Sequence, residues 1–138
     1  MEENPAVNRS RVHQGLLLLL SAGILSCSEP TEACTGDVDI SVGGSSLPSF
    51  SWAPDCALSG LIVVDVAEGS QWEINARSHE NTIESPVRYG DVPAGARESA
   101  PEAQLLRPNT YIVRVFRLTP IDNGSFLRDV AGEEIFDW

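Results

Sequence analysis

The sequence contains no lysine, only two histidines and a single methionine, so its nine basic residues are all arginines. Twenty aspartates and glutamates oppose them and give the chain a formal net charge of −11. A surface of this sign repels nucleic-acid phosphates and other anionic surfaces. The charge balance therefore argues against nucleic acid as a partner and favours a well-solvated exterior.

Residue patterns for catalysis or metal binding are also scarce. His79 is the only histidine after the N-terminal apolar segment, and it lies in a polar, turn-like stretch, residues 78–81. The chain has no Gly-x-Ser-x-Gly sequence and no glycine-rich phosphate loop. Asp37 and Asp39 alternate on one predicted strand face, but the Asp-x-Asp-x-Asp-Gly loop of a calcium site is missing. We therefore expect a protein that is not an enzyme and that binds neither a metal ion nor a cofactor.

Long apolar runs are missing too, with one short exception at residues 16–25. Ten residues are too few for a membrane-spanning helix, which takes about 20. They suit the apolar core of an export signal, and Arg9 and Arg11 precede them as such a signal requires. The residues that follow, Ile24-Leu25-Ser26-Cys27, resemble a bacterial lipobox. This resemblance implies a signal peptide over residues 1–26 and lipidation of Cys27.

Two alternatives remain open at this end of the chain. In the first, the protein is secreted after cleavage at Gly23, and Cys27 is an ordinary thiol. Glu2 and Glu3 are unusual in an export signal, so translation beginning at Val7 is a further hypothesis. If the cysteine is lipidated, Ser28 follows it rather than an aspartate, which favours the outer membrane of the bacterial envelope.

With Cys27 lipidated, Cys34 and Cys56 are the remaining cysteines. Exported proteins fold in an oxidising compartment, so we expect these two to form a disulfide. Closing a loop of this length contributes about 3 kcal/mol by chain entropy. Residues 27–35 are polar and without periodicity, and we interpret them as a flexible tether to a domain over residues 36–138.

Strand patterns dominate the rest of the sequence. Residues 37–42, 49–52 and 71–76 alternate polar and apolar side chains, which is the period of a half-buried strand. Residues 61–66 are β-branched and nearly continuous, as a central strand would be, and residues 111–118 form the clearest strand of all.

The remaining segments are turns, loops and edges. Residues 83–89 suggest an edge strand because Pro86 has no N–H to donate, and residues 90–101 suggest a long loop. Asn123-Gly124 predicts a tight hairpin, followed by a last strand over residues 133–138. Short strands at this spacing predict an all-β, antiparallel sandwich of about seven strands.

Two stretches resemble a fibronectin type III-like domain. Phe50-Ser51-Trp52-Ala53-Pro54 is similar to that family's second strand, and residues 106–115 are similar to its approach to the sixth strand. The resemblance implies an immunoglobulin/fibronectin type III-like sandwich in which Trp52 packs in the core and the tyrosine, here Tyr111, makes a corner hydrogen bond. Together with Trp72 and residues 86–96, the pattern is also similar to small uncharacterised bacterial lipoproteins.

Aromatic side chains offer the most specific functional signal. Trp72, Tyr89 and Trp138 are candidates for ligand binding because exposed aromatic rings stack on sugars and on partner side chains. The alternative places Trp52 and Trp72 in the core, on the apolar faces of their strands. Tyr89, beside a glycine and a loop, is the aromatic that we expect to be most exposed.

These observations favour a lipid-anchored, non-enzymatic interaction or accessory protein of the bacterial cell envelope. Its partners would be the membrane, through the lipid at Cys27, and an envelope protein. The alternative is a module that binds glycans or peptidoglycan through exposed aromatics, and an enzyme ranks third.

Overall fold

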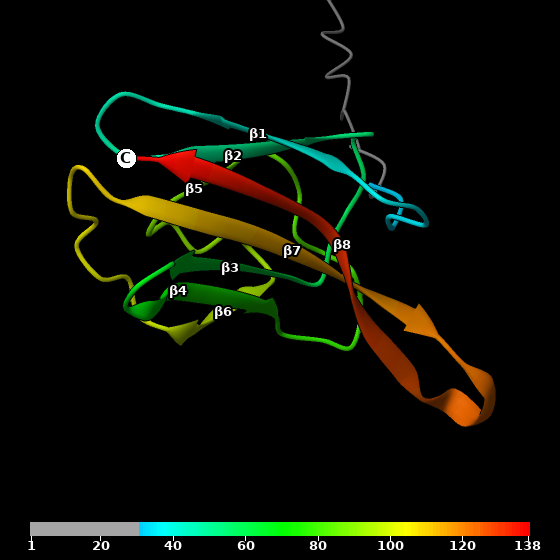
Figure 1. Ribbon diagram of the computed structural model, residues 1–138. Helices are drawn as coiled ribbons and strands as arrows, with labels where there is room; N and C mark the ends of the chain where they lie inside the picture. The colour runs from blue at the N-terminus through cyan, green and yellow to red at the C-terminus, as the bar shows by residue number, and fades with distance from the viewer. Residues whose placement is uncertain (1–30) are drawn as a thin grey trace, which may run out of the picture.

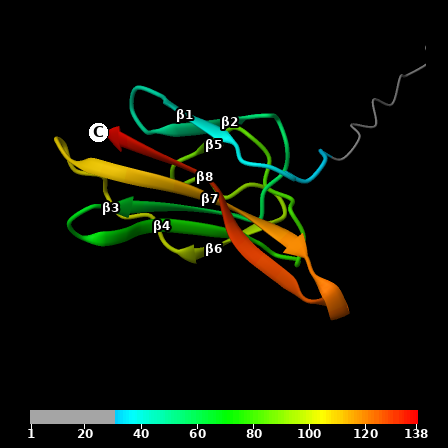
Figure 2. The same cartoon turned by 45° about the vertical axis from the view of Figure 1, so that its right-hand side comes forward.

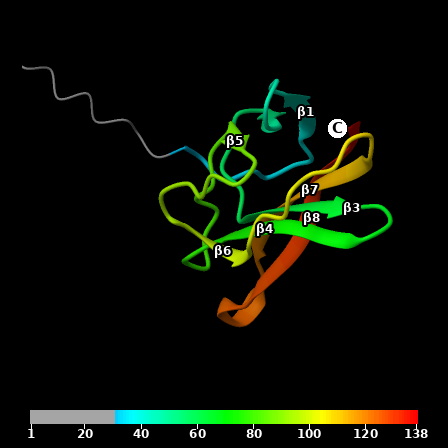
Figure 3. The same ribbon diagram turned by 90° about the vertical axis from the view of Figure 1, so that its left-hand side faces the viewer.

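A computed structural model describes residues 31–138, which fold into two antiparallel β-sheets packed face to face (Figure 1). The smaller sheet has the strand order β1-β2-β5, from β1 (Asp39–Gly43), β2 (Ser49–Ala53) and β5 (Val87–Arg88). The larger sheet has the order β6-β4-β3-β7-β8, from β3 (Gly60–Asp65), β4 (Gly69–Ala76), β6 (Ala96–Ala100), β7 (Thr110–Pro120) and β8 (Phe126–Asp137). The all-β sandwich of two layers expected from the sequence is thus confirmed (Figure 3). It has eight strands rather than seven.

Side-chain alternation explains how the strands face the core. In β2, Phe50 and Trp52 point inward between exposed or half-exposed neighbours. In β3, Leu61 and Val63 are fully buried while Ile62 and Val64, which alternate with them, are half-buried. β3 lies between β4 and β7, which is the central position predicted from its β-branched sequence.

The core joins the two sheets through aromatic contacts. Phe50 of β2 meets Phe136 of β8 with ring centroids 5.6 Å apart, and Tyr111 of β7 lies 5.6 Å from the same ring. The largest completely buried side chains also include Trp72, Leu58, Ile74 and Ile83.

The disulfide between Cys34 and Cys56 is present, as predicted. It links the segment before β1 to the segment after β2, and both cysteines are buried. The indole N–H of Trp52 donates to the carbonyl oxygen of Cys56 at 2.8 Å, so the same segment is held a second time.

Three predicted boundaries were wrong. Residues 90–101 are not all loop, since β6 pairs with the edge of β4; only Ala96 of β6 is buried, so the sequence carried no alternation there. The edge strand expected over residues 83–89 shrinks to the two residues of β5. The last strand begins at Phe126, not Glu133, because pairing with β7 continues to the turn.

The β7–β8 hairpin extends beyond the sandwich, and we call residues 117–130 the hairpin arm (Figures 1 and 2). The predicted turn is confirmed: Asn123 and Gly124 both adopt positive φ, at 71° and 72°, which this residue pair tolerates. Part-way along β8, the missing side chain of Gly132 lets Val38 approach, so that the Val38 N–H donates to Ala131 O at 2.8 Å.

The predicted signal peptide over residues 1–26, Cys27 and residues 28–30 of the predicted tether lie outside the described residues. Across residues 31–138 there is no helix of the length and apolar character needed to cross a membrane.

Candidate functional site

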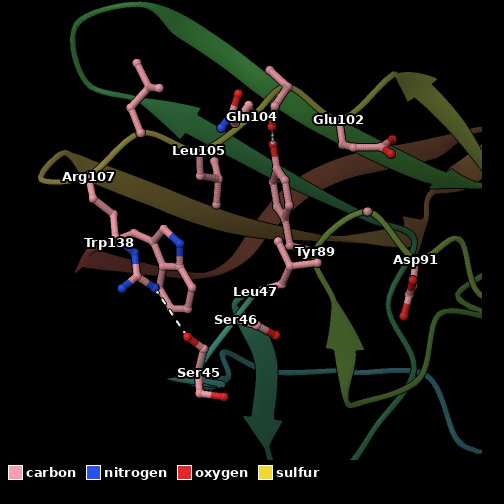
Figure 4. Close-up of a pocket in the computed structure, with 13 residues that line it drawn as sticks. Ser45, Ser46, Leu47, Tyr89, Asp91, Glu102, Gln104, Leu105, Arg107 and Trp138 are labelled. Atoms are coloured by element: carbon pink, nitrogen blue, oxygen red, sulfur yellow. Dashed lines mark hydrogen bonds between the residues drawn. The ribbon is translucent and has the colours of Figure 1, made fainter.

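An open groove of about 850 Å³ lies at the end of the sandwich where β7 begins and β8 ends. We call it the end groove. Three loops and the last residue form its walls: residues 45–47 between β1 and β2, residues 89–91 after β5, residues 102–107 before β7, and Trp138 (Figure 4).

Trp138 is the aromatic ring that the end groove displays. It is half-buried against the core, and its backbone exchanges two hydrogen bonds with Asn109, at 3.0 and 3.2 Å. The guanidinium of Arg107 lies 4.3 Å from the centre of the indole ring, within cation–π distance. Arg107 also reaches the carbonyl oxygen of Ser45 at 3.4 Å, so it spans two walls of the groove (Figure 4).

Tyr89 lines the same groove, but the expectation that it is exposed was wrong, since it is only 2% exposed. Its hydroxyl donates to the carbonyl oxygen of Ala103 at 2.8 Å and lies 3.1 Å from that of Gln71. Burial raises the pKa of this hydroxyl to about 12. Tyr89 therefore holds the 102–107 segment against β4, and it offers a ligand little surface.

Trp72 does not belong to the groove. It is completely buried, and its indole N–H donates to the Glu98 carboxylate at 3.0 Å. Its ring lies 5.2 Å from that of Tyr89, on the core side. The alternative that placed Trp72 and Trp52 in the core is therefore confirmed, and Trp72 is no candidate for direct contact with a ligand.

Tyr111 fixes the segment that carries Arg107. Its hydroxyl accepts from the Leu106 N–H at 2.8 Å and donates to the Leu106 carbonyl oxygen at 3.1 Å. These two bonds close the turn that precedes β7. Because Arg107 follows directly, the same anchor places the guanidinium over Trp138.

Arg107 is a groove residue that the sequence did not single out. The sequence placed it in the motif before Tyr111, but a cation–π contact between positions 107 and 138 depends on tertiary structure alone. The groove also presents the carboxylates of Asp91 and Glu102 and the exposed side chain of Leu47, so its lining is mixed rather than apolar.

Asp65 is the one carboxylate buried among residues 31–138. Its oxygens accept from the N–H groups of Ala67 at 2.7 Å and Glu68 at 3.0 Å, and from the Asn109 side chain at 3.0 Å. The bond from Ala67, supported by the other two, holds the pKa of this carboxyl below its usual value despite burial. Asp65 thus stabilises the β3–β4 turn.

His79 stacks on Phe126 of the hairpin arm, with ring centres 6.1 Å apart and planes inclined by 12°. No group of three or more His, Cys, Asp or Glu side chains in the described part of the chain is arranged to hold a metal ion.

The chain matches no protein-family model, no curated protein and no solved structure.

Proposed function

We propose that this protein is a lipid-anchored, non-enzymatic interaction protein of the bacterial cell envelope, and that the end groove receives its partner. The observation that carries the proposal is the position of the groove at the end of the sandwich remote from Cys34. The groove lies where β7 begins, whereas Cys34 lines a cavity together with residues 118–120, where β7 ends. The 11 residues of β7 separate the two by roughly 30 Å.

This geometry suits a tethered protein. The chain leads from Cys34 back towards Cys27, the lipidation site that the lipobox-like sequence implies. A lipid at Cys27 would hold that end near the bilayer, since acyl chains bind at about 0.8 kcal/mol per buried CH₂. The groove at the other end would then be open to partners in the envelope.

The arrangement of the titratable groups supports a binding role rather than catalysis. The Asp65 carboxylate is occupied by three donors, and the Tyr89 hydroxyl is occupied by backbone carbonyl oxygens. The His79 ring lies flat against Phe126. Each of these groups is thus engaged by neighbouring residues of the domain.

Membrane fractionation tests the anchor. Cys27→Ala is expected to shift the protein from the detergent phase to the aqueous phase, while Cys34→Ala leaves it in the detergent phase. Continued detergent partitioning of the Cys27→Ala variant would refute the lipid anchor.

Photocrosslinking in living cells tests the groove. A benzophenone amino acid at Leu106, 49% exposed beside the groove, is expected to give a discrete adduct. The same probe at Leu127, 54% exposed at the other end, is the matched control and should not give that adduct. Trp138→Ala should abolish the adduct from position 106. An adduct that is equal from both positions, or that survives Trp138→Ala, would contradict the assignment of the groove.

Glycan binding is the second candidate, and the partly exposed indole of Trp138 favours it. Beside that ring the groove presents Arg107, Gln104 and two carboxylates, which can hydrogen-bond sugar hydroxyls. Because Trp52 and Trp72 are buried, a saturable change in tryptophan fluorescence on titration with peptidoglycan fragments would report on Trp138. Trp138→Phe should remove the change, and a titration without any change would contradict glycan binding here.

A further inference from the structure

The hairpin arm carries a concentration of exposed apolar side chains. Ile121 is 50% exposed, Phe126 44%, Leu127 54% and Val130 47%. Single exposed apolar residues are ordinary on protein surfaces. Here four of them lie within ten residues, on an arm that extends beyond the sandwich (Figures 1 and 2). Exposed apolar surface at such a position indicates contact with something outside the domain.

The arm lies beside the point where the chain leads towards the lipidation site. Cys34 and its neighbours Ala33 and Thr35 line one cavity together with Phe126 and residues 118–120 of the arm. Cys34 is held in the domain by the disulfide and is buried. It lies seven positions after Cys27, with six residues between them, and seven fully extended Cα-to-Cα steps span at most about 25 Å. A lipid on Cys27 would therefore keep Cys34 within that distance of the bilayer surface, with residues 118–120 and Phe126 of the arm beside it.

We propose that the tip of the hairpin arm is a membrane-contacting element, and that its occupant is the interfacial region of the lipid bilayer. This inference rests on the lipid anchor of the proposed function. Ile121 and Leu127 would enter the boundary between headgroups and acyl chains, where amphipathic elements lie about 5–10 Å deep. Such contact would orient the sandwich as well as hold it.

The arginines of the arm are engaged within the domain, so contact would be made through apolar groups beside the carboxylate of Asp122 at the turn. Arg117 pairs with Asp129 at 2.7 Å and with Asp37 at 3.5 Å. Arg128 lies 3.9 Å over the ring of Phe116 and donates to Asn75 at 2.9 Å. Both arginines of the arm are thus engaged, and the domain as a whole is acidic. The arm therefore has no free basic side chain to attract anionic headgroups, and we expect it to contact a zwitterionic bilayer through its apolar side chains.

Two attachments on the same end define an orientation. With the lipid at Cys27 and the arm tip both in the bilayer, β7 runs away from the membrane towards its first residue, Thr110. The end groove, with Trp138 and Arg107, then faces away from the lipid surface. The arm would thereby keep the groove accessible instead of letting the domain lie on its side.

Fluorescent labelling of the full-length, acylated protein tests the inference. Leu127→Cys and Ile121→Cys are purified from membranes, labelled with the environment-sensitive dye NBD and reconstituted in phosphatidylcholine vesicles. Val66→Cys, 64% exposed in the β3–β4 turn at the groove end, is the control. We expect a blue shift and a several-fold rise in emission at positions 121 and 127, but not at 66. Lipids with a nitroxide near the headgroup should quench more strongly than lipids with one near the chain end.

The outcomes separate this inference from the function on which it rests. Acyl chains on Cys27 by intact mass, together with water-like emission at 121 and 127, would overturn the membrane contact and leave the anchor standing. Shielding of both positions in native membranes but not in pure lipid vesicles would overturn it in favour of a protein partner. A protein without acyl chains would overturn both. Circular dichroism of the labelled variants confirms that they are folded.

Discussion

Replacing Tyr111 by phenylalanine should destabilise the domain out of proportion to the single oxygen atom removed. The Tyr111 ring is 1% exposed and would stay in place against Phe136, so the core keeps its apolar contacts. Its hydroxyl, however, accepts from the Leu106 N–H at 2.8 Å and donates to the Leu106 carbonyl oxygen at 3.1 Å. The variant loses both hydrogen bonds at once and leaves a donor and an acceptor of one peptide residue without their partner.

The expected loss follows from the number of bonds. An intramolecular hydrogen bond contributes roughly 0.5–1.5 kcal/mol net, so two of them give a loss of about 2 kcal/mol in the free energy of unfolding. Tyr89→Phe is the matched control, because Tyr89 is equally buried but donates mainly to one carbonyl oxygen, that of Ala103. Its loss should be about 1 kcal/mol.

Urea denaturation of residues 28–138, followed by tryptophan fluorescence, measures both variants. The midpoint of Tyr111→Phe should fall by about 1 M urea with an unchanged slope, since the area exposed on unfolding is the same. A loss for Tyr111→Phe that is equal to or smaller than that for Tyr89→Phe would refute the reasoning. It would mean that water replaces the Leu106 hydrogen bonds at no cost.

Three further predictions concern the disulfide, the close approach of Val38 to Gly132 in β8, and the buried Tyr89. The double variant Cys34→Ser and Cys56→Ser should lose about 3 kcal/mol of stability in urea denaturation, because the unfolded chain regains the entropy of the closed loop; an unchanged midpoint would contradict this. In Gly132→Ala the new Cβ would lie 2.5 Å from the Val38 carbonyl oxygen. We expect a loss of about 1–3 kcal/mol in the free energy of unfolding and faster hydrogen exchange of the Val38 N–H. Unchanged exchange would contradict this, because it would show that the backbone around Val38 accommodates the added methyl group. Burial raises the pKa of Tyr89 from 10.0 to about 12. The contribution of its neutral hydroxyl to stability is therefore complete below pH 10 and should decline as the pH rises from 10 to 12. Tyr89→Phe should remove that part of the decline in alkaline denaturation, and an identical pH profile for both proteins would contradict it.

Local sequence patterns were sufficient wherever residues adjacent in the chain decide the structure. Alternation in residues 49–52 and 71–76 predicted the strands β2 and β4. Asn123-Gly124 predicted the hairpin turn because few other residue pairs tolerate two consecutive positive φ angles. Patterns failed for β6, whose strand exists because the edge of β4 is available to pair with it.

In the candidate site, too, the sequence decided some features and the tertiary structure decided the others. The sequence indicated three aromatics but could not say which of them would be exposed. Tyr89 follows Arg88, the last residue of the edge strand, and precedes a glycine, so its local sequence resembles a loop. The tertiary structure buries it because Gln71 and Ala103 bring two carbonyl oxygens to its hydroxyl.

By itself, then, the sequence determined the all-β class, the Cys34–Cys56 pairing and the hairpin turn, because each rests on composition, on the small number of cysteines or on residues close together in the chain. Only the tertiary structure decided that Arg107 covers Trp138, that Tyr89 and Trp72 are buried, and that the apolar arm lies beside Cys34 at the end opposite the groove. These depend on which strands pair and how the two sheets pack, and such contacts join residues that no local pattern connects.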